Sequence, residues 1–97
     1  MLRIVARYEL PEENVSEFIK YALIMVKLSK IETGCEYYEL FRDINKSAFS
    51  FIETWKDMKS IIAHKNETHY NYYVPMMEYI STKVTVDIYD VHKQWLK

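Results

Sequence analysis

His64 and His69 are the side chains of this chain best able to exchange a proton near neutral pH. An imidazole changes its charge close to pH 7, so a neutral histidine can take a phenolic proton. A helical metal-binding pair is spaced i, i+4, as in H-E-x-x-H, and needs a further carboxylate or histidine ligand. These two histidines are five positions apart, and His92 is distant. We therefore expect no metal site. Two roles stay open for the histidines: at least one lines a pocket as a base, or one of them only caps or bridges the break between two helices.

A carboxylate, Glu53, precedes Trp55 by two positions on an expected strand, so both side chains point to the same face. On such an apolar face a carboxylate needs a hydrogen bond or a charged partner. We expect Glu53 either to orient one of the two histidines or to pair with Arg7 or a tyrosine.

Four aromatic side chains accompany these groups: Tyr38, Trp55, Tyr70 and Tyr73. They are expected to line a pocket for a flat ligand, and the alternative is that they belong to the hydrophobic core. The predominance of tyrosine over phenylalanine favours hydroxyl groups that meet water or a ligand.

The hydrophobic patterning predicts the elements that position these residues. Alternating and β-branched stretches indicate strands, and i, i+3, i+4, i+7 spacing indicates an amphipathic helix. Gly34 opens a hairpin with a polar loop at 43–47, and Pro75 predicts a kink or a break in the last helix. The predicted elements are strand 2–9, a helix whose first turn includes Glu12 and Glu13 and which ends near 31–33, strands 35–42 and 48–55, a short helix 57–65 with Asp57 as its N-cap, a helix from 68 onward and strand 82–91.

This order predicts one α+β domain over residues 1–97 with the ferredoxin-like β-α-β-β-α-β pattern. The helices are expected on one face of a four-stranded antiparallel sheet. Neither face of the hairpin is cleanly polar, so we expect a second copy to cover the other face. The apolar tail residues Trp95 and Leu96 are expected to dock on a partner.

Composition narrows the function classes. The net charge is −1 without a basic stripe, which argues against a nucleic-acid partner. No apolar run approaches about 18 residues, and the chain begins with an expected strand, so we expect neither a membrane span nor a signal peptide. The single cysteine fits a reducing compartment, and we expect a cytoplasmic protein.

Three blocks carry a resemblance to one family. Residues 32–40 (ETGCEYYEL) resemble E-x-G-C-x-x-Y-x-L, residues 51–55 (FIETW) resemble F-x-E-x-W, and residues 63–70 (AHKNETHY) resemble A-H-x-x-x-x-H-F with Tyr70 for Phe. These are signatures of antibiotic biosynthesis monooxygenase domains. The resemblance implies a homodimer whose two sheets pack into an α/β barrel, with a pocket between sheet and helices in each subunit.

The same family includes cofactor-independent monooxygenases of polycyclic phenols and quinols, haem-degrading enzymes and an isomerase of a phosphorylated sugar. In the haem-degrading branch an Asn, a Trp and a His are required where this chain has Arg7, His64 and Val74. Haem degradation is therefore not expected.

Our first hypothesis is a small oxygenase that needs no metal or flavin and acts on a quinol or phenolic aromatic with O₂. His64 or His69 would be its base. The second is a proton-shuttling isomerase of a small phosphorylated sugar-like metabolite, in which Lys65 meets the phosphate. The third is a non-catalytic dimer that binds a small ligand.

Overall fold

The computed structural model describes residues 1–91 and places the elements close to their predicted bounds. In chain order they are β1 (Leu2–Glu9), a single 3-10 turn η1 (Glu12–Asn14), α1 (Val15–Lys30), β2 (Cys35–Arg42), β3 (Ala48–Trp55), α2 (Met58–Lys65), α3 (Thr68–Tyr79) and β4 (Lys83–Asp90). The tail with His92, Trp95 and Leu96 lies outside the described residues.

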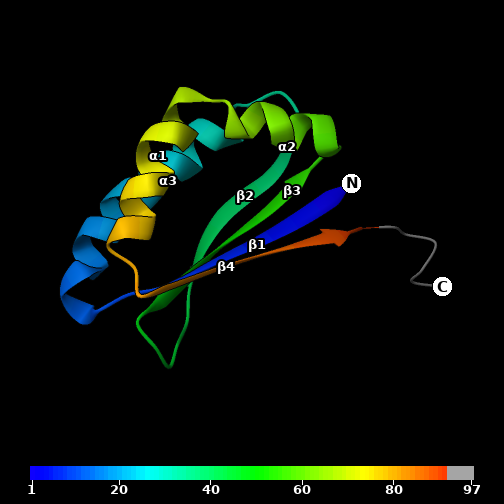
Figure 1. Ribbon diagram of the computed structural model, residues 1–97. Coiled ribbons are helices and arrows are strands. Elements are labelled where there is room, and N and C mark those ends of the chain that lie inside the picture. Colours follow the sequence, from blue (N-terminus) through cyan, green and yellow to red (C-terminus); the bar gives the residue numbers. More distant parts are fainter. Residues whose placement is uncertain (92–97) are drawn as a thin grey trace.

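The four strands form one antiparallel sheet in the order β2-β3-β1-β4, and the helices lie on one of its faces (Figure 1). The predicted α+β ferredoxin-like arrangement is confirmed, with the second helical region divided into α2 and α3. No helix within residues 1–91 is long and apolar enough to span a bilayer.

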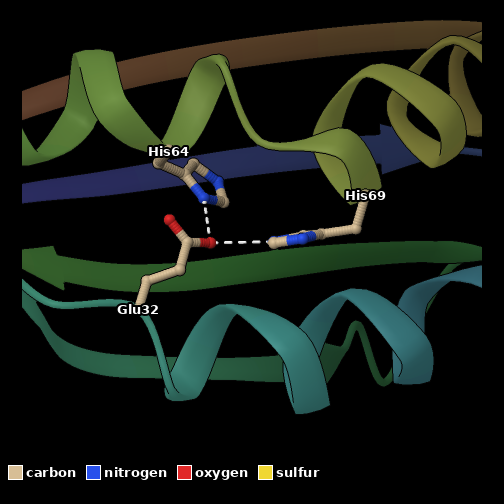
Figure 2. A group of neighbouring side chains, drawn as sticks. All are labelled: Glu32, His64 and His69. Carbon is tan, nitrogen blue, oxygen red and sulfur yellow. Dashed lines mark hydrogen bonds and ion pairs between the residues drawn. The ribbon is translucent and has the colours of Figure 1, made fainter.

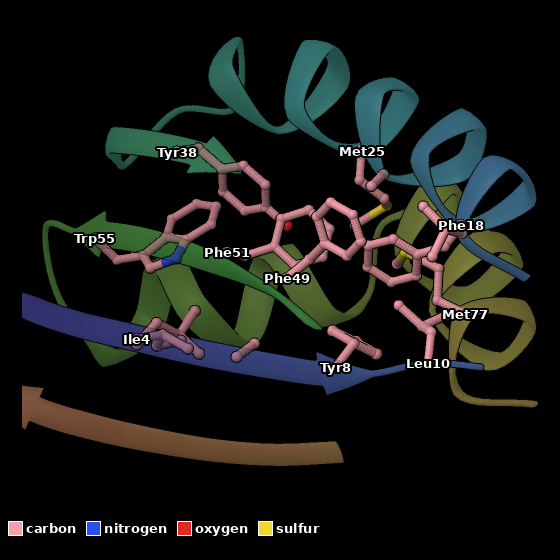
Figure 3. Packing of buried hydrophobic residues seen from close by; sticks show 14 residues of the cluster. Ile4, Tyr8, Leu10, Phe18, Met25, Tyr38, Phe49, Phe51, Trp55 and Met77 are labelled. Carbon is pink, nitrogen blue, oxygen red and sulfur yellow. The ribbon is translucent and has the colours of Figure 1, made fainter. Parts of the chain in front are cut away.

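The core lies between α1 and the sheet. Phe18, Ala22 and Met25 follow the predicted helical spacing and are fully buried. Figure 3 shows Phe18 and Met25 facing the aromatic side chains of β3. The rings of Phe18 and Phe49 stack with centroids 5.2 Å apart. This aromatic layer fixes the distance between helix and sheet on which the cavity beside it depends.

Two local features set the position of α2. Gly34 has φ 128°, a backbone conformation that favours glycine. A Cβ at that position would lie 2.1 Å from Ser60 Oγ, so the turn before β2 packs directly on the start of α2. As predicted, Asp57 caps that helix: its Oδ1 accepts the Ser60 backbone N–H at 2.8 Å.

Of the two outcomes predicted at Pro75, a kink or a break, the break does not occur, since α3 runs from Thr68 to Tyr79 through the proline. Met77, two positions on, is fully buried, and Val74 packs against the same core cluster. Packing on both sides of the proline stabilises one helix despite the missing N–H donor.

The edge strand β4 extends past the cover that the helices provide (Figure 1). Val84, Val86 and Ile88 share one side as predicted, because they pair with the helix-facing residues of β1. Val86 and Ile88 nevertheless remain 57% and 47% exposed. On the opposite face of the sheet, Tyr37 and Phe41 are also exposed, so the hairpin is apolar on both faces as the sequence indicated.

Candidate active site

A cavity of about 170 Å³ lies between the sheet and the helices α2 and α3. Strands β1 and β3 form its floor, β2 contributes one tyrosine, and β4 forms one rim. Its polar lining comprises Tyr8, Tyr38, Glu53, His64, Lys65, Tyr70 and Glu78, and its apolar lining Ile4, Ala6, Phe51, Val74, Met77, Val86 and Ile88. A cavity of this size matches one aromatic ring, because an apolar cavity of about 150 Å³ holds benzene.

His64 lines the cavity and is 3% exposed. Its ring lies against Trp55, with centroids 4.5 Å apart, and the Tyr70 ring meets it edge-on at 5.0 Å. Nδ1 of His64 lies 2.8 Å from Glu32 Oε2 (Figure 2). Packing and hydrogen bonding together hold the ring in one orientation.

Glu32 binds both histidines through a single oxygen. His69 Nε2 also lies 2.8 Å from Glu32 Oε2, approaching from α3 while His64 approaches from α2 (Figure 2). A carboxylate oxygen accepts hydrogen bonds, so we assign the ring hydrogens to His64 Nδ1 and His69 Nε2. The other nitrogen of His64, Nε2, then carries a lone pair, and it has no hydrogen-bond partner among residues 1–91.

The charge state of His64 follows from its surroundings. Burial lowers the pKa of His64 below its usual value, although the hydrogen bond and charge of Glu32 oppose that change. At neutral pH the imidazole is therefore uncharged and able to accept a proton.

Glu53 sits beside His64 in a different role from either expected one. Its Oε1 accepts a hydrogen bond from Trp55 Nε1 at 2.9 Å, and both side chains are buried. None of the expected partners binds it within residues 1–91: Glu32 holds the histidines, Arg7 pairs with Asp43 at 3.1 Å, and no tyrosine hydroxyl donates to Glu53. Burial raises the pKa of Glu53 to about 7, with a further contribution from the nearby Glu32.

The structure separates the predicted pocket residues into two groups. Tyr38, Glu53, His64 and Tyr70 line the cavity. Trp55 supports His64 from behind and is itself fully buried. His69 lines an outer groove with Glu67 and Leu28 and is not part of the cavity lining. Its Nε2 contacts Glu32, and its ring centroid lies 6.1 Å from that of His64.

Tyr73 packs away from the cavity lining. Its ring lies 5.9 Å from that of Tyr21 and 4.8 Å from that of Tyr72. It therefore contributes to the contact between α1 and α3 instead of forming a wall of this cavity.

The Glu32, His64 and His69 side chains are also the residues that could hold a metal ion, since their ligand atoms lie within 4.8 Å of one another. Sequence spacing missed this third donor. Tetrahedral zinc ligands at 2.0–2.1 Å from the metal stand about 3.3 Å apart. The 2.8 Å separations from Glu32 fit hydrogen bonds better than this ligand set.

A family model and a protein of known sequence are both similar to this chain. The family model described as "Antibiotic biosynthesis monooxygenase" matches residues 1–75. A protein of Bacillus subtilis (strain 168) described as "Putative monooxygenase YcnE" is 28% identical over 75 residues, which cover 76% of this chain and 79% of that protein.

Two solved structures share the fold along almost the whole chain. One, described as "Crystal structure of antibiotic biosynthesis monooxygenase", is 26% identical with a TM-score of 0.90 and covers 95% of this chain and 99% of that one. The other, a conserved protein from Methanosarcina mazei Go1, is 25% identical with a TM-score of 0.90, covering 94% and 92%.

Proposed function

Because this chain belongs to the antibiotic biosynthesis monooxygenase family, we propose that it is a small oxygenase in which His64 deprotonates a quinol or other phenolic substrate. The observation that carries the proposal is the hydrogen bond from His64 to Glu32 at the wall of the cavity. It leaves an uncharged, oriented nitrogen beside a space that accommodates one ring. A base with its pKa near or below the working pH suits this task.

The first step is proton transfer. His64 Nε2 takes the hydroxyl proton of the substrate, and Glu32 stabilises the resulting imidazolium through Nδ1–H. The phenolate passes one electron to O₂, and the radical and superoxide combine to form a C–O bond on the ring. The peroxide anion then recovers the proton from His64 as a hydroperoxide.

Loss of water from this hydroperoxide completes the oxygenation. The ring carbon loses its hydrogen as a proton, the O–O bond breaks, and a carbonyl forms. For hydroquinone, the balance is hydroquinone plus O₂ giving hydroxybenzoquinone plus water. The substrate supplies all the electrons that reduce O₂, so the proposal includes no metal, flavin or external reductant.

The cavity also favours a limited substrate size. Its volume of about 170 Å³ lies below the roughly 300–1,000 Å³ of drug-sized ligand pockets. A single ring fits inside, and a second ring would need space beyond the cavity, whose lining includes the partly exposed Val86 and Ile88 of β4. We therefore choose a monocyclic quinol as the first substrate to test and a reduced naphthoquinone as the second.

An isomerase is the second candidate, and Lys65 is the observation that favours it. Lys65 lines the cavity next to His64, where its ammonium would attract a phosphate group. A small sugar phosphate that raises the melting temperature, without stabilisation by quinols, would support this alternative. Stabilisation by neither, together with no turnover, would support a non-catalytic binding dimer or another ligand.

We also propose a homodimer in which a second copy covers the open face of the sheet. On this face Phe41 is 45% exposed and Tyr89 is 53% exposed. Arg7, on the same face, is paired within the chain by Asp43. Sedimentation velocity should give twice the 11.8 kDa chain mass. Phe41→Asp should give monomer, whereas the control Leu23→Asp on α1 should not; a wild-type monomer at micromolar concentration would contradict the dimer.

Isotope labelling tests the oxygenase proposal. The protein is supplied with hydroquinone under ¹⁸O₂, and the product is analysed by mass spectrometry. Hydroxybenzoquinone with one labelled oxygen, formed only with active protein, is the expected result. Formation of benzoquinone and hydrogen peroxide alone would show oxidase chemistry, and no product from either quinol would contradict the proposal.

A further inference from the structure

We propose that Glu53 is a second catalytic residue of the cavity, which in its neutral form donates a hydrogen to an oxygen atom of the bound substrate. This inference rests on the proposed function, because it requires an oxygen-bearing substrate next to His64. Nothing in the preceding mechanism uses Glu53. Glu53 lines the same cavity as His64, so it can act as the acid where His64 acts as the base.

Glu53 is buried without a direct ion pair, although Lys65 lines the same cavity. Glu53 is 5% exposed. Within residues 1–91 its carboxyl forms no ion pair: the acidic residues that do are Glu9, Glu32, Glu39 and Asp43. Burying an unpaired carboxylate costs far more than burying a neutral carboxyl group. The site therefore favours the protonated form.

The hydrogen-bond geometry indicates which oxygen carries the hydrogen. Trp55 Nε1 donates to Oε1 at 2.9 Å, and Trp55 is fully buried, so this side of the carboxyl is fixed. Oε2 has no hydrogen-bond partner in the described part of the chain. Because Glu53 lines the cavity, the hydroxyl of the neutral acid is available to a ligand there.

The groups around Glu53 agree with this assignment. The pKa of Glu53 is raised to about 7: burial is the largest cause and Glu32 adds to it, whereas the Trp55 hydrogen bond and the Lys65 charge act in the opposite direction. The ionisable side chains whose pKa values respond to Glu53 are Tyr8 on β1, Cys35 and Tyr38 on β2, and Tyr70 on α3. Burial raises all four pKa values, so these groups are uncharged at neutral pH, and Lys65 is the cation whose charge opposes the protonated form of Glu53.

The two groups then have opposite roles in the loss of water. His64 takes the proton from the ring carbon, the O–O bond breaks, and Glu53 gives its proton to the departing oxygen. Water leaves and the ring carbon becomes a carbonyl. The proton on His64 then returns to the Glu53 carboxylate, so both groups end as they began. Environments that push two titratable groups in opposite directions are typical of acid–base pairs.

Infrared spectroscopy of the full chain tests the protonation state directly. Between pH 6 and pH 8.5 the wild type should lose the C=O band of a protonated carboxyl group with a midpoint of about 7. Glu53→Gln should lack this band, and the control Glu39→Gln, whose side chain is 42% exposed, should keep it. At pH 6, saturating 4-nitrophenol should move the band to lower frequency. Absence of the band, or a band that bound 4-nitrophenol leaves unmoved, would overturn the proposal.

Kinetics separate the acid role from a structural one, because the amide oxygen of Gln can still accept the Trp55 hydrogen. Glu53→Gln should lower kcat for hydroquinone about 100-fold with KM changed less than about threefold. It should also abolish the decline of wild-type kcat above pH 7. Unchanged kcat with the same decline would contradict the role. Absence of wild-type turnover would reject the proposed oxygenase but not the inference about Glu53. The infrared experiment decides separately whether Glu53 is protonated and whether it contacts bound 4-nitrophenol.

Discussion

His64 Nδ1 lies 2.8 Å from Glu32 Oε2, which joins the segment after α1 to the last turn of α2. The two residues are 32 positions apart in sequence. Glu32 stands just before the turn at Gly34, whose close packing on Ser60 brings this segment to α2. The contact selects the tautomer with its lone pair on Nε2, so it determines both the direction and the chemistry of the base.

Replacement of Glu32 tests whether this contact assists catalysis. Glu32→Gln keeps an oxygen acceptor but removes the charge that stabilises the His64 imidazolium. We expect kcat for hydroquinone to fall about 10–100-fold, as for other partners that orient a functional histidine. Oxygen uptake measures the effect, with Glu39→Gln as the control. An unchanged kcat in Glu32→Gln would show that the carboxylate charge has no part in the reaction.

Replacement of each histidine distinguishes their roles. His64 lines the cavity, whereas His69 lies outside it and contacts Glu32. We expect His69→Ala to lower kcat less than about tenfold and His64→Ala to lower it more than about 100-fold. Equal losses would place His69 in the chemistry itself. Circular dichroism of both variants provides the control for folding.

The elements of the fold could be read from the sequence because their patterns are local. Strands 35–42 and 48–55 have the predicted bounds, since polar residues 43–47 interrupt two aromatic stretches. The helix face of Phe18, Ala22 and Met25 follows from spacing alone. The choice between a kink and a break at Pro75 stayed open, because it depends on tertiary packing around Val74 and Met77.

The site was less accessible to sequence reasoning. The histidines and Glu53 were identified, but their partners depend on contacts between distant segments. Glu32 was noticed only as the first residue of a family-like block, although it is the residue that binds both histidines. Gly34, two positions later and the only glycine of the sequence, was the available signal that the backbone makes a tight turn here.

The titration of Glu53 should also appear in stability. Its pKa is about 7 in the folded protein against the usual 4.5, so between these values the folded state holds more protons than the unfolded state. The free energy of unfolding therefore falls as pH rises through that range, because ionised Glu53 is less stable in the buried site than in the unfolded chain. Glu53→Gln removes the effect, so its melting temperature relative to wild type should be several degrees more favourable at pH 8 than at pH 5. A difference independent of pH would contradict the raised pKa.

The Gly34 turn should tolerate no side chain. In Gly34→Ala the new Cβ would lie 2.5 Å from Ser60 Cβ, and φ 128° is strained for alanine. We expect a loss of unfolding free energy of about 1–3 kcal/mol from backbone strain, with more from the clash. Urea denaturation measures this loss, and the same change in a Ser60→Gly background should cost less because the clash is removed. Equal costs in both backgrounds would exclude the Ser60 contact as a cause.

The ionisation of bound 4-nitrophenol tests the role of His64 most directly, since the phenolate has an absorption that the phenol lacks and no turnover is required. At pH 6, saturating wild-type protein should bind the compound as its phenolate, paired with the protonated His64. His64→Ala should bind it as the neutral phenol. The same ionisation state in both proteins would contradict the assignment of His64 as the base.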